Sequence, residues 1–132
     1  ALPQYERAFE VLEKGLGKDD PAIAGAASDL ADAYRDLGKD AKAEPLYRQA
    51  LKLVEADAGK DHPDTACASM DLGECLVRLK KLKDGEAALK RALEILKAAK
   101  DADAQDLADA EAAMGRLRLV QGRAADAEAL AL

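Results

Sequence analysis

Residues 30–51 read LADAYRDLGKDAKAEPLYRQAL, a stretch that contains two amphipathic segments separated by a break. Leu30, Ala31 and Tyr34 follow one another at helical spacing, and the apolar pattern stops at Gly38. The pattern resumes after the break at Ala43, Leu46, Tyr47, Ala50 and Leu51. Because apolar residues three and four positions apart lie on one face of a helix, this stretch predicts two helices joined by a short turn.

The same pattern recurs at a shift of forty-two residues along the whole chain. GKDDP at residues 17–21 returns as GKDHP at residues 59–63, and Leu30 is followed by Leu72 and Met114. Self-similarity at a fixed period is the signature of a repeat protein. The register predicts a second helix alone at residues 3–17, a full pair at 21–59, another at 63–101, and a partial pair at 104–132 whose last helix is shortened to 124–132.

Small residues recur where the two helices of a unit are expected to cross. They are Ala31, Gly73 and Gly115 on the first helix, and Ala43, Gly85 and Ala127 on the second. A glycine inside a helix costs about 1 kcal/mol relative to alanine, so glycines at repeat positions indicate a close approach of two backbones. We therefore predict an all-α fold, an α-solenoid of stacked antiparallel helix pairs with about seven helices.

Charge and cysteine content limit the classes of function. The formal net charge of −6 disfavours binding to nucleic acid or to an anionic membrane surface, both of which require clustered basic residues. Cys67 and Cys75 lie eight residues apart in one predicted helix, a separation of roughly 12 Å that is too long for a disulfide. With no apolar run long enough to cross a membrane and no leader segment, we expect a cytoplasmic protein.

No combination of residues predicts an enzyme. His62 is the single histidine, and a helix start separates it from Cys67, so a Cys–His nucleophile pair is not expected. His62, Cys67 and Cys75 span more than two helical turns and cannot close around one zinc ion. We therefore expect no catalytic residue, no metal and no cofactor.

The residues quoted above resemble the tetratricopeptide repeat family, in particular the forty-two-residue repeats of kinesin light chains. Residues 30–51, followed by GKDHPDTA at residues 59–66, are similar to that family's helix–turn–helix unit and linker. The resemblance covers essentially the whole chain. It implies a superhelical scaffold that binds a peptide or helix of a partner protein in a concave groove lined by the first helix of each pair. The family commonly carries an asparagine pair on that helix, whereas this sequence contains no asparagine.

The repeat register predicts which side chains face the groove. These are Ser28, Asp32, Arg35, Asp36, Cys67, Met70, Glu74, Val77, Arg78, Asp109, Ala112, Arg116, Leu119 and Val120. We expect the three arginines to bind carboxylates of a partner, and Met70, Val77 and Leu119 to hold apolar side chains. The alternative is that mixed charges merely solvate an idle face. Tyr5, Tyr34 and Tyr47 lie at helical spacing and are expected to fill the core.

A second function remains open from the sequence. Residues 127–132 read AEALAL, which is a poor polar cap for the end of a repeat array. An apolar end of this kind favours a structural or self-assembly module that pairs through its terminal helices to form a homo-oligomer.

Overall fold

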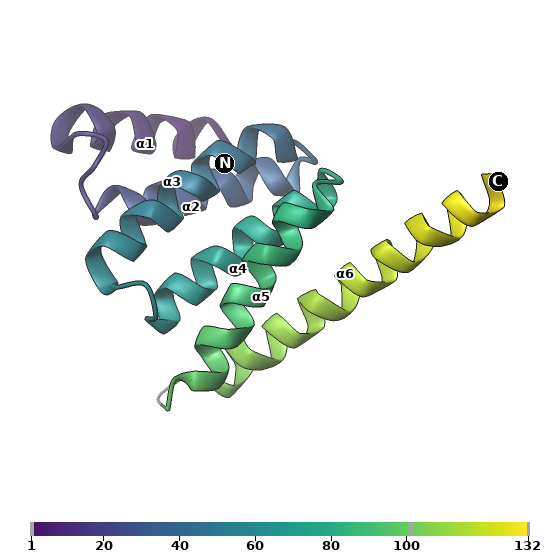
Figure 1. Ribbon diagram of the computed structural model, residues 1–132. Helices are drawn as coiled ribbons and strands as arrows, with labels where there is room; N and C mark the ends of the chain where they lie inside the picture. The colour runs from purple at the N-terminus through teal and green to yellow at the C-terminus, as the bar shows by residue number, and fades with distance from the viewer. Residues whose placement is uncertain (1, 101, 132) are drawn as a thin grey trace.

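The computed structural model describes residues 2–100 and 102–131, and that part of the chain forms six helices and no strand (Figure 1). The helices are α1 (Leu2–Leu16), α2 (Ile23–Asp36), α3 (Asp40–Ala58), α4 (Pro63–Arg78), α5 (Leu82–Ala98) and α6 (Ala104–Ala131). Each helix packs against the next one along the chain, and α4 also contacts α6. The predicted all-α solenoid of antiparallel helix pairs is confirmed.

The helices alternate between two roles. We call α2, α4 and α6 the A helices, because each is the first helix of a repeat, and α1, α3 and α5 the B helices. The pairs α2–α3 and α4–α5 are the helix hairpins, and their stacking places α4 between α2 and α6. The A helices therefore form one layer of the solenoid and the B helices the other (Figure 1).

The turns between helices repeat with the sequence period. Gly38 and Lys80 each follow an A helix and adopt left-handed backbone conformations, with φ of 74° and 66°. Gly17 and Gly59 follow successive B helices and also have positive φ angles, of 88° and 109°. Both pairs are forty-two residues apart, so the repeat read from the sequence is also a repeat of backbone geometry.

The predicted number of helices differs from the observed one at the end of the chain. The sequence predicts a separate helix over residues 124–132, and Gly122 just before it is the counterpart of Gly38 and Lys80 in the register. Instead α6 continues through Gly122 to Ala131 and projects away from the solenoid (Figure 1). The residues around Gly122 are strong helix formers. Within the described residues, no helix that follows α6 folds back onto it, so no packing holds the chain in a turn at Gly122.

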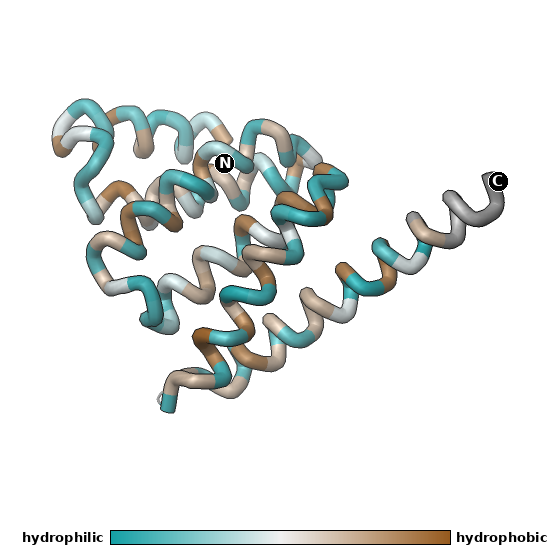
Figure 2. The backbone as a smooth tube through the Cα atoms, in the orientation of Figure 1, coloured by the Kyte–Doolittle hydropathy of each residue, from teal (hydrophilic) through white to brown (hydrophobic). Residues whose placement is uncertain are grey.

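The core lies between the helices of neighbouring layers, where hydrophobic positions face one another (Figure 2). Its centre contains Ala31, Ala43, Tyr47, Leu72, Cys75 and Leu76. The predicted helix crossing is confirmed in the second repeat, where a β-carbon on Gly85 would lie 3.2 Å from the carbonyl oxygen of Gly73. The side chain of Ala127, predicted to lie at the same crossing one repeat later, is outside the described residues.

Local interactions begin the A helices. The ring of His62 accepts a hydrogen bond at Nδ1 from the backbone N–H of Asp64 (3.0 Å), which caps α4 just before Pro63. The Asp20 carboxylate accepts from the N–H of Ala22 (2.9 Å), so it caps the turn that precedes α2. His62 is therefore explained by helix capping. None of the described helices combines the length and apolar character needed to cross a membrane.

The three tyrosines differ in burial. Tyr47 is 1% exposed and fills the core as predicted, and Tyr34 is half-buried. The prediction for Tyr5 is wrong, because this side chain is 41% exposed on α1. The reason is that α1 has no A helix preceding it within the described residues, so its outer face has no neighbour. The side chains of residues 124 and 126–132, including the apolar tail, lie outside the described ones.

Candidate functional site

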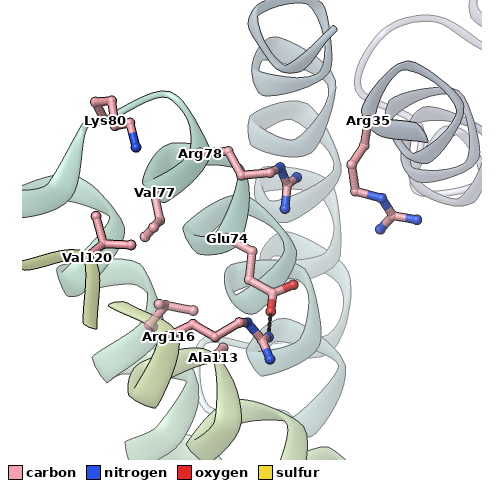
Figure 3. A pocket seen from close by; sticks show the side chains of 9 residues that line it. Arg35, Glu74, Val77, Arg78, Lys80, Ala113, Arg116 and Val120 are labelled. Carbon is pink, nitrogen blue, oxygen red and sulfur yellow. Dashed lines mark hydrogen bonds and ion pairs between the residues drawn. The ribbon is translucent and has the colours of Figure 1, made fainter. Parts of the chain in front are cut away.

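A hollow of about 490 Å³ opens on the A-helix layer between α4 and α6. Six of the residues predicted to face the groove line it: Arg35, Glu74, Val77, Arg78, Arg116 and Val120. They come from three A helices, so the stacking of repeats brings them together from positions far apart in the sequence. Figure 3 shows Glu74 lying between the guanidinium groups of Arg78 and Arg116. The hollow is the candidate site.

Each of the three arginines is already paired with a carboxylate of the chain. Arg35 binds Asp32 and Asp36 on its own helix, at 3.3 and 3.2 Å. Arg78 of α4 reaches Asp40 at the start of α3, at 2.8 Å. Arg116 of α6 pairs with Glu74 of α4 (Figure 3). The sequence register predicted that these side chains share a face, but it did not predict their partners.

The three residues predicted to hold apolar side chains of a partner, Met70, Val77 and Leu119, differ in where the structure places them. Met70 is half-buried and packs against two core clusters between α4, α5 and α6, so it is not free to hold a ligand side chain. Val77 packs against the core and also lines the hollow. Leu119 is 64% exposed and lies outside the hollow. Of the apolar residues predicted to face the groove, Val77 and Val120 therefore line the hollow.

The remaining predicted residues are not brought to this hollow. Asp32 and Asp36 line a separate hollow against α1, together with Tyr5. Ser28 and Cys67 are half-buried on α2 and α4, while Asp109 and Ala112 are exposed on α6. The A-helix face thus has separate depressions, and the one lined by Arg78 and Arg116 contains six of the fourteen predicted residues.

Asp71 is a functional candidate that sequence analysis did not select. Burial, together with the nearby carboxylates of Asp32 and Glu74, raises the pKa of Asp71 to about 7, and Arg35 and Arg78 oppose this shift only in part. The Asp71 side chain therefore changes charge near neutral pH beside the arginines of the hollow. The clue in the sequence was its position, because it lies one residue after Met70, which the repeat register predicts to face the groove.

A hydrogen bond from Tyr47 holds the carboxylate of Asp32, one of the acidic residues predicted to face the groove. The buried Tyr47 hydroxyl donates to Asp32 at 2.5 Å, linking α3 to α2. Burial, followed by this bond to a carboxylate, raises the pKa of Tyr47. Asp32 thus accepts from both Tyr47 and Arg35, so two side chains of the protein hold its carboxylate in place.

The two cysteines are not activated. Burial and the neighbouring carboxylate of Asp106 raise the pKa of Cys67 to about 12, and burial also raises the pKa of Cys75. Both thiols are free, as the sequence spacing predicted. Among the side chains that the structure describes, no group of three His, Cys, Asp or Glu residues could hold a metal ion.

Three further residues complete the hollow. Lys80 lies at the left-handed turn after α4, Leu89 belongs to α5, and Ala113 belongs to α6. Neither Leu89 nor Ala113 is among the residues that the repeat register predicts to face the groove. Lys80 could have been found from the register, because it follows the groove-facing Arg78 by two residues and its counterpart Gly38 marks the same turn.

The sequence of the repeats identifies the family. A family model described as tetratricopeptide repeat matches residues 1–56 and again residues 24–98, which together make up well over half of the chain. The chain belongs to the tetratricopeptide repeat family. Proteins built from tetratricopeptide repeats are generally scaffolds for interactions with other proteins.

A solved structure confirms the fold. The crystal structure of BtubC (BKLC) from P. vanneervenii superposes with a TM-score of 0.71 at 20% sequence identity. The match covers 92% of this tetratricopeptide chain and 56% of the BtubC chain, so the chain spans a little over half the length of that protein. The helical stacking is therefore the same, in agreement with the forty-two-residue type of repeat predicted here. None of the curated proteins compared with the chain matches it.

Proposed function

We propose that this tetratricopeptide domain is a protein-interaction scaffold that binds a peptide or helix of a partner protein on its A-helix face. The single observation that supports this most strongly is the hollow between α4 and α6, to which three A helices contribute. At about 490 Å³ its volume lies within the range of roughly 300–1,000 Å³ that is typical of ligand pockets.

The charge of the hollow favours an acidic side chain of the partner. Four basic side chains line it, from Arg35, Arg78, Lys80 and Arg116, against the single carboxylate of Glu74. The arginines are paired with carboxylates of the chain, and a carboxylate of the partner would take the place of one of these in binding them. A partner carboxylate can displace Glu74 from Arg116 without leaving the guanidinium unpaired.

The apolar wall favours an aliphatic side chain next to that carboxylate. Val77 and Val120 face the hollow from α4 and α6, and Leu89 and Ala113 lie with them. Burying one aliphatic side chain there supplies roughly 1.5–3 kcal/mol of favourable free energy, and the charge pairing fixes its orientation. The motif that we expect is an acidic residue and an aliphatic residue within one short peptide.

A random peptide library displayed on phage tests this proposal. We expect the selected peptides to be enriched in Asp or Glu next to Leu, Ile or Val. A synthetic peptide carrying the selected motif should bind a double Arg78→Ala, Arg116→Ala variant at least about tenfold more weakly than it binds the parent chain. The reason is that removing one partner of a buried charge pair costs roughly 2 kcal/mol or more.

A charge-matched control separates the site from the net charge of the chain. Arg48→Ala with Arg91→Ala removes the same number of positive charges from the B helices α3 and α5, and should leave affinity for the peptide unchanged. Full affinity of the Arg78, Arg116 double variant would disprove groove binding at this hollow. Equal losses in both double variants would show that attraction is non-specific.

A second candidate function is self-assembly through the terminal helices. Among the side chains that the structure describes, four of the five large hydrophobic ones that are exposed belong to α1 or α6: Tyr5, Val11, Leu16 and Leu119. Exposed apolar side chains concentrated at the ends of a repeat array are typical of surfaces that bind another repeat. This observation, and not the hollow, supports assembly.

A further inference from the structure

The two ends of the solenoid carry faces that the inner helices bury. α1 is a B helix without an A helix of its own, and α6 is an A helix without a B helix of its own, within the described residues (Figure 1). The two helices lie at opposite ends of the stack. One end therefore lacks the type of helix that the other end carries.

The free face of α1 has the residue pattern of a buried B-helix face. Tyr5 is 41% exposed and Val11 is 61% exposed. Their counterparts at shifts of forty-two and eighty-four residues are all buried in α3 and α5: Tyr47, Leu53, Leu89 and Ile95. The difference has one cause, since α3 and α5 each pack on an A helix of their own repeat. The free face of α1 is thus ready to receive an A helix.

The corresponding face of α6 has no B helix packed on it within the described residues. In α4, a β-carbon on Gly73 would lie 2.8 Å from the Leu89 side chain, so the B helix fills this position. Gly115 is the counterpart of Gly73 on α6, and a β-carbon there would meet no described atom within 4 Å. Ala108 is likewise exposed, whereas its counterpart Ala66 is buried against α5. α6 therefore has the small residues for a close helix contact but no helix on them.

We propose that α1 of a second copy of this chain packs on α6 of the first, so that copies join head to tail and the forty-two-residue register continues across the junction. The inference rests on the proposed self-assembly function and adds its geometry. Tyr5 of the second copy lies over Gly115 of the first, as Leu89 lies over Gly73. Leu119, which is 64% exposed, takes the position of Val77 beside that tyrosine.

A hydrogen bond that occurs twice within the chain supports the same register. Gln49 donates to the carbonyl oxygen of Lys18 at 3.4 Å, and Arg91, its counterpart, donates to the carbonyl oxygen of Lys60 at 3.3 Å. In each case a B helix holds the loop before its own A helix. The third donor in this series is Arg7, and the third acceptor is the carbonyl of Ala102. Arg7 of the second copy reaches that loop across the junction.

The charges on the A helices are complementary at the junction. Asp32, Glu74 and Arg116 occupy one position in successive repeats, and Glu74 pairs with Arg116 of the next A helix. Across the junction the register places Arg116 of the first copy beside Asp32 of the second, which again gives opposite charges. Within one chain, Asp32 and Glu74 are neighbours of like charge. The pairing of Arg116 with Asp32 across the junction is therefore electrostatically more favourable than the pairing of Asp32 with Glu74 within the chain.

One residue opposes tight association. Glu111 occupies the position of Ala27 and Ser69, which are both buried against a B helix. The junction would bring its carboxylate out of water, at a cost in free energy. We therefore expect reversible association, which strengthens when this charge is removed.

Sedimentation equilibrium on the 132-residue chain, from low micromolar to millimolar concentration, tests assembly first. Head-to-tail contact does not close at two copies, so the average mass should pass that of a dimer as concentration rises. Mass equal to one chain throughout would overturn both self-assembly and its head-to-tail geometry. Mass that stops at a dimer would leave self-assembly standing and overturn the head-to-tail contact.

A pair of complementary variants tests the geometry itself. Gly115→Leu fills the free face of α6, and Tyr5→Glu with Val11→Glu places charge on the free face of α1. All three positions are open to solvent, so each variant should fold, and each alone should be monomeric. An equimolar mixture should form a one-to-one complex, because each copy retains the end that the other lacks. Two monomeric variants that do not associate when mixed would overturn the proposal.

Two further variants complete the test. Gly25→Leu is the control, because Gly25 is also helical and open but is the counterpart of Cys67, which the register predicts to face the groove. This variant should assemble like the parent chain. Glu111→Ser restores the type of residue found in α4 and should tighten association about tenfold or more. Weaker association of Glu111→Ser would contradict the register at this interface.

Discussion

Gly73 of α4 lies so close to Leu89 of α5 that a β-carbon on the glycine would come within 2.8 Å of the leucine Cγ and Cδ2 atoms. Leu89 is 1% exposed, so neighbouring side chains hold it in place. The same position one repeat later, Gly115, is open among the described residues. One sequence position thus has two environments, and the difference can be measured.

We expect Gly73→Ala to destabilise the domain by up to about 2 kcal/mol. Overpacking costs roughly 1–3 kcal/mol, and the higher helix propensity of alanine recovers about 1 kcal/mol. Gly115→Ala gains that propensity without a clash and should be stabilising by up to about 1 kcal/mol. Urea unfolding at low micromolar concentration, followed by circular dichroism, gives both values. Equal effects of the two substitutions would show that the helix crossing is not tight at Gly73.

Tyr47→Phe should lower the free energy of unfolding by about 1.5–3 kcal/mol, because it removes a buried hydrogen bond to the Asp32 carboxylate. Tyr5→Phe is the matched control at the equivalent position of α1, where the side chain is 41% exposed, and it should change stability by less than about 0.5 kcal/mol. Chemical denaturation of both variants compares them directly. A loss for Tyr47→Phe no larger than that of the control would mean that the bond contributes nothing.

Asp71 should make stability depend on pH between its ordinary pKa of 3.8 and its folded pKa of about 7. The folded chain holds this proton more tightly than the unfolded chain, so the contribution of Asp71 to the free energy of unfolding falls as pH rises through that range. Asp71→Asn removes the charge. We expect the variant to gain about 1 kcal/mol or more relative to the parent between pH 5 and pH 8.

Denaturant titrations at the two pH values give this difference. Asp29→Asn, at the same repeat position of α2 but exposed, serves as the control. If the stability difference between Asp71→Asn and the parent is the same at both pH values, the carboxyl group is not held protonated by its surroundings.

Cys67 should react slowly with iodoacetamide at pH 8. Its pKa of about 12 leaves little thiolate, which is the reactive form. A Cys75→Ser variant makes Cys67 the single thiol, and labelling followed by mass spectrometry should be at least about tenfold slower in the folded chain than in urea. Labelling at the denatured rate would show that the thiol is exposed or activated.

The A-helix face shows where prediction from the sequence succeeded and where it stopped. The forty-two-residue register placed Arg35, Arg78 and Arg116 on one side of the solenoid, and the hollow contains all three. It could not assign their partners, since Asp40 and Glu74 reach them from other helices. Met70 was expected in the groove and packs in the core, because the space between α4, α5 and α6 depends on side chains from all three helices.

The sequence by itself determined the helices, the turns at Gly38 and Gly59, and the repeat that joins them, because apolar spacing and turn chemistry act over a few residues. Only the tertiary structure decided which repeat positions are filled. Tyr5 and Gly115 carry the repeat pattern yet stay open, and Gly122 stays helical, since burial requires a neighbouring helix that local sequence cannot supply. Apolar patterning marks a surface for packing, and the presence of a partner determines whether that surface is buried.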